Sequence, residues 1–243
     1  YDSMISNYFT EELFPEKITI GLKKSQSLRY GENPHQKAAI YEAGSRKQEG
    51  GSAKQLQGKE LSYNNYLDMD SAFNLVCDLQ KPSCVIVKHN NPCGVSSSAN
   101  ILDAYKNAFL CDSISAFGGI VAFNKSVDGK TAEEVIKVFT ECVIAPNYSK
   151  DALKVFSQKQ NLRVLTKSTV RQDTHTIEYR NISDGFLVQG KDDKIFDTLK
   201  VVTKTKPTKQ QLESLRFAFT VGKYVKSNTI VLVRGTQTVG IGA

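Results

Sequence analysis

The sequence contains no tryptophan, only two methionines and three histidines, and its five cysteines include no Cys-x-x-Cys pair. It also lacks an apolar run near the roughly 20 residues that a membrane-spanning helix needs. Its first residues show no basic stretch followed by an apolar one, as a secretory signal would. We therefore expect a protein that is neither inserted in a membrane nor secreted.

The cysteines point to a reducing compartment. Their number is odd, and Cys77, Cys84 and Cys142 lie in apolar stretches, where free thiols behave as small hydrophobic groups. A cytoplasmic location is the natural interpretation. The chain begins with tyrosine and ends on a glycine-rich stretch, so we expect the natural polypeptide to extend beyond it.

Size and charge leave several classes of partner open. The 243 residues, 40% hydrophobic and 23% charged, suffice for one large or two small globular domains. The net charge of +7 fits a solvated surface, or attraction of a phosphorylated small molecule or a nucleic acid. Because the basic residues are scattered, without an arginine-rich run, we expect neither a nucleic-acid nor a membrane partner.

Strand and helix patterns alternate along the chain, which predicts a layered α/β fold with a largely parallel sheet. Helices are expected from apolar spacing at 68–79 and 99–110, from capping boxes at 131–134 and 208–211, and at 149–157 with Ser149 as the N-cap. The stretch 44–58 is expected to be a loop, and 166–207 a polar excursion with extended or hairpin structure at 174–190. Strands are expected at 36–42, 84–87, 118–123, 142–146, 162–165, 229–233 and 238–242.

The stretch KHNNPCG (88–94), directly after a short apolar strand, allows three interpretations. Zinc nucleotide deaminases carry His-x-Glu followed by Pro-Cys-x-x-Cys, but here two of three ligands and the catalytic glutamate are missing. A polar turn with a solvated Lys88 and a locally bonded His89 is the plain alternative. The third is metal-free chemistry, with Lys88 stabilising negative charge and His89 moving a proton.

The third interpretation requires the strand to end by residue 88 or 89, because adjacent side chains of a strand point to opposite faces. Pro92 and Gly94 in NNPCG favour such an ending through a turn. Ligands of open α/β sheets bind outside the carboxyl ends of strands, which is where Lys88 and His89 would then lie.

Other polar groups gather near predicted strand ends, and each has a structural alternative. Arg29, Tyr30 and His35 lie in a loop that is either surface or ligand-binding; Arg suits phosphate. Asn64 and Asn228 fit helix capping as well as ligand binding. Further candidates are Phe117 with Gly118, where glycine allows close backbone approach, and Glu141, an acid that needs a partner to be functional.

Six separated motifs make the chain resemble a known family: LRYGENPHQKAAIY, KELSYNNYLDMDSA, KHNNPCG, SAFGGIVAFN, VIAPNYS and VKSNTIVLV…TVGIGA. In this order they resemble the AICAR transformylase domain of the bifunctional AICAR transformylase/IMP cyclohydrolases. The resemblance covers nearly the whole chain. It implies a cytidine-deaminase-like layered α/β fold without the deaminase zinc.

The resemblance also implies an activity and a site. The reaction is formyl transfer from 10-formyltetrahydrofolate to the 5-amino group of AICAR, in purine biosynthesis. Its catalytic pair would be Lys88 and His89, with no metal, in a homodimer that shares its active site. The implied AICAR-binding residues are Arg29, Tyr30, His35, Asn64, Phe117, Gly118, Glu141 and Asn228.

The resemblance suggests three parts: 1–27 as a leading segment after an absent cyclohydrolase domain, 28–206 as a first deaminase-like half, and 207–243 as the start of a second half. The family's later segments, which add substrate and folate contacts, are not in this sequence. A non-catalytic nucleotide-binding or dimerisation fragment is therefore the alternative to a complete formyltransferase.

Overall fold

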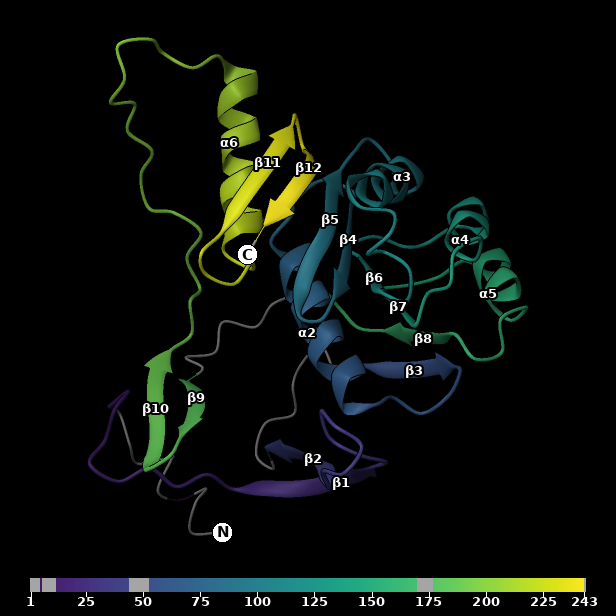
Figure 1. The fold of residues 1–243 in the computed structure, drawn as a ribbon, viewed down its shortest axis with the longest axis vertical. Coiled ribbons are helices and arrows are strands. Elements are labelled where there is room, and N and C mark those ends of the chain that lie inside the picture. Colours follow the sequence, from purple (N-terminus) through teal and green to yellow (C-terminus); the bar gives the residue numbers. More distant parts are fainter. Residues whose placement is uncertain (1–4, 6–11, 44–52, 170–176, 243) are drawn as a thin grey trace.

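A central eight-stranded sheet organises the computed structural model, which describes residues 5, 12–43, 53–169 and 177–242 (Figure 1). Its strands lie in the order β11-β12-β5-β4-β6-β7-β8-β3. Their bounds are β3 (Lys54–Gln57), β4 (Ser83–Lys88), β5 (Asn91–Ser97), β6 (Ile120–Phe123), β7 (Cys142–Ala145), β8 (Arg163–Thr166), β11 (Ile230–Arg234) and β12 (Gln237–Gly242). The α/β class predicted from the sequence is confirmed.

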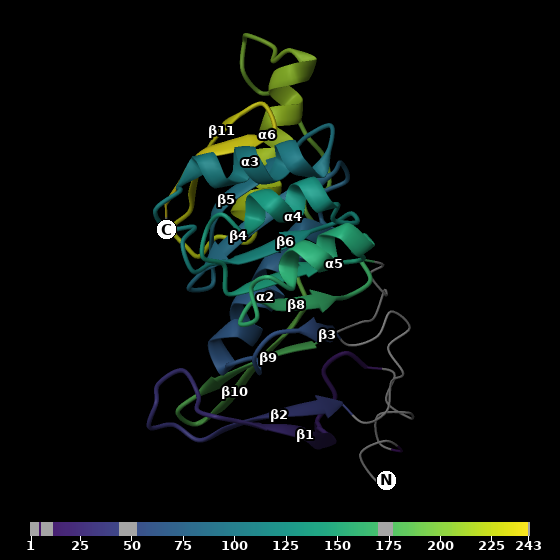
Figure 2. The same ribbon diagram turned by 90° about the vertical axis from the view of Figure 1, so that its right-hand side faces the viewer.

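Helices cover both faces of this sheet. One face packs against α3 (Ile101–Cys111), α4 (Gly129–Val135) and α5 (Lys150–Phe156), which lie side by side in Figure 2. The other face packs against α2 (Tyr63–Cys77) and α6 (Lys209–Gly222). The result is a three-layer sandwich with the sheet in the middle.

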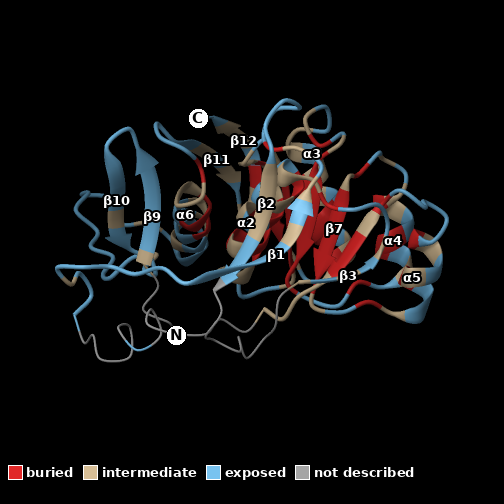
Figure 3. Cartoon of the chain, turned by 90° about the horizontal axis from the view of Figure 1, so that it is seen from below, coloured by how far each residue is buried: buried red, intermediate tan, exposed pale blue. Residues whose placement is uncertain are grey.

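The sheet is buried on both faces because its central strands are apolar without interruption. In β4, Cys84 and Ile86 point into the core beneath α3, whereas Val85 and Val87 point into the core beneath α2. This period of two is the ordinary alternation of a strand. Figure 3 shows the buried residues concentrated in the sheet and the helix faces against it.

The expectation of a largely parallel sheet was wrong. Strand β4 pairs antiparallel with both β5 and β6, and β12 pairs antiparallel with β5 and β11. Within the described sheet, only the β6–β7 and β7–β8 pairs are parallel. The reason is the tight connection from β4 to β5, since parallel neighbours need a long crossover.

Strand β5 was not predicted because Pro92 and Gly94 suggested a turn. The chain instead turns at residues 89 and 90 and continues as a strand, in which Val87 pairs with Pro92 and Ile86 with Gly94. The register shift leaves Cys93 as a β-bulge between them. Proline and glycine are tolerated in a strand at such a bulge.

Helix caps explain where the remaining boundaries differ. Helix α2 begins earlier than expected because Ser62 caps it, and Asn65 completes the capping box. The expected capping box at 131–134 is wrong, since Asp128 caps α4 and accepts from the backbone N–H of Thr131. The caps at Ser149 and Thr208 are confirmed, although α6 ends at Gly222 rather than near residue 226.

Two hairpins lie outside the central sheet. The first pairs β1 (Leu22–Leu28) with β2 (Ala38–Ala43), and the second pairs β9 (Ile177–Ile182) with β10 (Gly185–Gly190). The second confirms the hairpin expected in the polar excursion. Strand β3 is a correction, because the stretch 44–58 was expected to be a loop; residues 44–52 lie outside the described ranges. No described helix combines the length and hydropathy needed to cross a membrane.

Gly94 fixes how closely α3 approaches the sheet. A Cβ at this position would overlap the carbonyl oxygen of Ala108 in α3. Only glycine, which has no side chain, lets the strand and helix backbones meet there. The position of α3 therefore depends on this residue.

We predict that Gly94→Ala destabilises the protein by about 1–3 kcal/mol or more, because the overlap involves backbone that cannot rotate away. Urea unfolding followed by circular dichroism measures the change. Gly242→Ala is the matched control, since a Cβ at Gly242 meets nothing within 4 Å. Equal unfolding midpoints for the two variants would contradict the close approach.

Candidate active site

Lys88 and His89 lie where β4 ends, in the turn that joins β4 to β5. Lys88 is the last residue of β4 and pairs with Asn91, so the turn itself consists of His89 and Asn90. Both have left-handed backbones, with φ of 54° and 63°. This is the two-residue hairpin geometry that matches the twist of antiparallel strands. The condition set by the sequence, a strand that ends by residue 88 or 89, is confirmed.

The left-handed turn is held by a carboxylate from α2. Asp68 accepts a hydrogen bond from the backbone N–H of His89 at 3.2 Å and from that of Asn90 at 2.7 Å, one on each oxygen. A left-handed backbone costs about 1–2 kcal/mol per non-glycine residue. Hydrogen bonds to a charged group contribute roughly 1.5–3 kcal/mol each, so two of them can offset this strain.

A second contact from α2 reaches the same turn. The hydroxyl of Ser71 donates to the side-chain oxygen of Asn90 at 2.5 Å. Asp68 and Ser71 are three residues apart, so they share one face of the helix. The turn is therefore held through its backbone by Asp68 and through its side chain by Ser71.

The amine of Lys88 points toward the loop that precedes β6. It donates to the backbone carbonyl of Phe117 at 2.8 Å. Its positive charge also helps to lower the pKa of the Asp112 carboxyl, after the larger effect of hydrogen bonds from Ser115. Lys88 thus links the end of β4 to the segment after α3.

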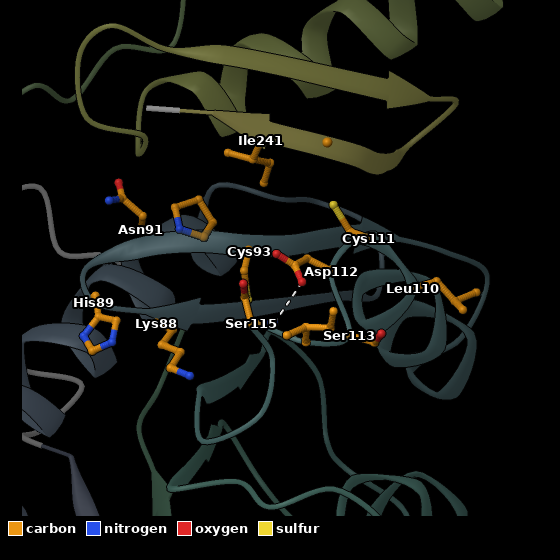
Figure 4. A pocket seen from close by; sticks show the side chains of 13 residues that line it. Lys88, His89, Asn91, Cys93, Leu110, Cys111, Asp112, Ser113, Ser115 and Ile241 are labelled. Atoms are coloured by element: carbon orange, nitrogen blue, oxygen red, sulfur yellow. Dashed lines mark hydrogen bonds between the residues drawn. The ribbon is translucent and has the colours of Figure 1, made fainter.

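Lys88 and His89 both line one cavity of about 540 Å³ (Figure 4). Its walls come from the β4–β5 turn, the end of α3 with the following segment, and the end of β12. Small-molecule sites commonly measure roughly 300–1,000 Å³. The remaining lining residues are Asn91, Pro92, Cys93, Leu110, Cys111, Asp112, Ser113, Ile114, Ser115, Gly240 and Ile241.

Phe117 and Gly118 follow soon after the cavity-lining Ser115, and Glu141 lies near them, because its backbone N–H donates to the carbonyl of Gly119. Gly118 has a φ of 74°, and its backbone N–H donates to the carbonyl of Phe139. The Phe117 and Phe139 rings are 5.3 Å apart. Glu141 forms an ion pair, in which Arg163 donates to its carboxylate at 2.5 Å.

The remaining candidates lie elsewhere in the chain. Arg29, Tyr30 and His35 belong to the loop between β1 and β2, and Arg29 stacks over the ring of Tyr30 at 5.8 Å. This loop meets the start of α2, where the side chain of Asn64 donates to the carbonyl of Glu32. The fold brings these residues to one another but not into the cavity lined by Lys88.

Asn228 lies after α6 rather than at its end, so it is not the helix C-cap, which is Lys223. Its side-chain oxygen accepts from the hydroxyl of Ser227. Nearby, the backbone N–H of Lys226 donates to the side chain of Asn91, a residue of the cavity wall. Asn228 therefore lies two residues from a contact with the β4–β5 hairpin, outside the cavity lining.

Sequence reasoning missed Asp68 and the cavity wall formed by residues 110–115. No local pattern marks Asp68, because its partners in the turn lie 21 and 22 positions further along the chain. Residues 110–115 comprise the end of α3 and the segment after it, and no pattern in them marks the wall of a cavity. A site formed by contacts between distant segments leaves no spacing pattern in the sequence.

Cys93 and Cys111 line the cavity, but their thiols are held protonated. Burial raises the pKa of Cys93 to about 12, and the nearby Asp112 carboxylate adds to that shift. Burial also raises the pKa of Cys111. The thiolate is the reactive form of cysteine, so neither side chain is a nucleophile near neutral pH. Among the described residues, no group of three His, Cys, Asp or Glu is placed to hold a metal ion.

Comparison with known proteins gives a consistent result. The family model described as "AICARFT/IMPCHase bienzyme" matches residues 1–243. The chain is 47% identical to the bifunctional purine biosynthesis protein PurH of Caldicellulosiruptor saccharolyticus, covering all of this chain and 49% of that protein. PurH proteins of Parvibaculum lavamentivorans and Clostridium botulinum are 48% and 46% identical over the whole chain, which covers 47% and 48% of them. The chain thus spans about half the length of these curated relatives.

The raised pKa of Cys93 gives a direct prediction. At pH 8 the native protein should leave Cys93 unmodified by iodoacetamide, because the thiol is almost fully protonated there. Peptide mass spectrometry measures the modified fraction. The same protein unfolded in urea is the control and should react quickly. Modification of Cys93 in native protein as fast as in the unfolded protein would show that the thiol is not buried.

Proposed function

Because this chain belongs to the AICARFT/IMPCHase bienzyme family, we propose that it carries the formyl-transfer site of a purine-biosynthesis enzyme. The reaction moves a formyl group from 10-formyltetrahydrofolate to the 5-amino group of AICAR. One observation carries the proposal: Lys88 and His89 leave the end of a buried strand and line the same cavity.

The reaction needs help with both charge and protons. The amine of AICAR is a weak nucleophile because its lone pair is delocalised into the imidazole ring. When its nitrogen attacks the formyl carbon, negative charge develops on the formyl oxygen and the nitrogen must lose a proton. The bond from the formyl carbon to N10 of the folate then breaks, and N10 takes up a proton.

Lys88 and His89 supply these two requirements. His89 is exposed on the turn at the cavity, where its imidazole takes the proton of the amine and returns one to N10. A positioned base contributes about 10²–10⁴-fold in rate. Lys88 offers a positive charge at the cavity wall for the developing oxyanion, and one such donor contributes about 10²–10³-fold.

The cavity also suits the formyl donor. Its volume of about 540 Å³ is sufficient for a flat ring system. Leu110 and Ile114 present apolar side chains that are 69% and 86% exposed at its wall, and such surfaces favour an aromatic ring. 10-Formyltetrahydrofolate is therefore the co-substrate we assign to this cavity.

AICAR binding draws on the other candidate residues. The amine of Lys88 donates to the carbonyl of Phe117, Gly118 follows that residue, and the backbone N–H of Glu141 donates to the carbonyl of Gly119. These three residues would therefore contact AICAR from the same chain. The net charge of +7 suits a phosphorylated substrate. Asn228 would contact it from the segment after α6.

The residues of the β1–β2 hairpin support a shared site. Arg29, Tyr30 and His35, with Asn64, lie outside the cavity of their own chain. We propose that they reach AICAR in the neighbouring subunit of a homodimer. We also propose that the fold is of the cytidine-deaminase-like type, without zinc. Residues 28–206 would form its first half and residues 207–243 the start of the second.

A second function has support from the length of the chain. Because the chain spans about half of its relatives, it would act as a nucleotide-binding or dimerisation module if chemistry needs their remaining segments. Incubation of the 243-residue chain with AICAR and 10-formyltetrahydrofolate distinguishes the two. Release of tetrahydrofolate supports a complete formyltransferase, whereas AICAR binding without release supports the module.

We predict that removal of the imidazole of His89 in the full-length protein lowers kcat at least about a hundredfold while AICAR still binds. The best variant is His89→Asn, because asparagine accepts the left-handed backbone of the turn, and His89→Ala is the second. Initial rates give kcat, and titration calorimetry gives the Kd for AICAR. A near-normal kcat in both variants would exclude His89 as the base.

A further inference from the structure

The turn that carries His89 has an unusual dependence on one side chain. Its two residues are both non-glycine and both left-handed, and their backbone N–H groups both point to the carboxylate of Asp68. Asparagine and histidine adopt this conformation more readily than most residues, but less readily than glycine. The conformation therefore needs an external partner, and the Asp68 carboxylate is the only acceptor that the described contacts show for these two backbone N–H groups.

Asp68 is well placed to transmit the position of α2 to the site. It lies in the middle of α2, whose neighbouring residues Met69 and Ala72 are buried in the core beneath the sheet. A carboxylate anchored on a packed helix has a fixed position, unlike one on a loop. Because its two oxygens bond to the backbone N–H groups of the turn, Asp68 fixes the backbone that carries the imidazole of His89.

We propose that Asp68 is the positioning residue of the catalytic turn: its carboxylate holds the His89 and Asn90 amides so that the imidazole faces the cavity. This rests on the proposed function, since it assigns a role within the same formyl-transfer site. Each carboxylate oxygen of Asp68 accepts from a backbone N–H of the turn, so Asp68 acts through the turn. The cavity-lining residues do not include it.

The main test compares two aspartates of the same helix in the full-length protein. Asp68→Ala should lower kcat about tenfold to a hundredfold and leave the KM for AICAR within about threefold, because a small displacement of a catalytic group costs rate more than binding. Asp70→Ala is the matched control, since Asp70 is exposed and bonds only to Asn74 in the described contacts. Equal kcat in the two variants would overturn the proposal.

A second variant separates positioning from direct chemistry. Asn90→Gly gives the turn a residue that adopts a left-handed backbone freely, so the turn depends less on the carboxylate. Two ratios are compared: the fall in kcat caused by Asp68→Ala in the unmodified protein, and the fall caused by Asp68→Ala in the Asn90→Gly variant. The second fall should be smaller than the first by about threefold or more. If the loss persists in full, the carboxylate acts on the substrate or on the proton, and the positioning role is wrong.

A measurement without activity keeps this inference separate from the proposed function. Amide hydrogen exchange of the 243-residue chain should show faster exchange at His89 and Asn90 in Asp68→Ala, and unchanged exchange in Asp70→Ala. If the unmodified full-length protein shows no formyl transfer, the proposed function fails. The exchange test still decides whether Asp68 holds the turn. If the unmodified protein is active but exchange at His89 and Asn90 is unchanged in Asp68→Ala, the positioning role of Asp68 is wrong and the proposed function stands.

Discussion

The hydrogen bonds between Asp68 and the β4–β5 turn connect the core of this protein to its candidate chemistry. Asp68 belongs to α2, which packs against the sheet through its buried face. Its carboxylate bonds to a two-residue turn in which both residues have left-handed backbones. A turn of this kind is tight enough to keep β4 and β5 in register up to the Lys88–Asn91 pair. The side chains of His89 and Lys88 therefore extend from a backbone that is fixed at the end of the sheet.

The cavity exists because three separate segments end at the same place. The β4–β5 turn, the segment after α3 and the end of β12 meet there, and each is brought in by packing elsewhere. Gly94 lets α3 lie against β5, which sets where the segment after α3 begins. Thr238 of β12 bonds both backbone groups of Val95. A change in any of these contacts would alter the wall opposite Lys88 and His89.

The structure divides the candidate residues into two groups. Lys88 and His89 line the cavity, and the amine of Lys88 bonds to the carbonyl of Phe117. Arg29, Tyr30 and His35 instead lie on a hairpin outside the central sheet. This separation is what a site shared between two copies of the chain would require.

The sequence by itself determined most of the helices and strands and the end of β4 at Lys88 and His89, because apolar periodicity, caps and short motifs are local. It failed at β5, where Pro92 and Gly94 suggested a turn but flank a bulge at Cys93. It also failed at the strand directions, which depend on the connection between β4 and β5. It also failed to reveal Asp68, whose partners are 21 and 22 residues away. Only the tertiary structure decided these points, because hydrogen bonds between segments distant in the chain depend on how helices and strands pack, and no local spacing records that packing.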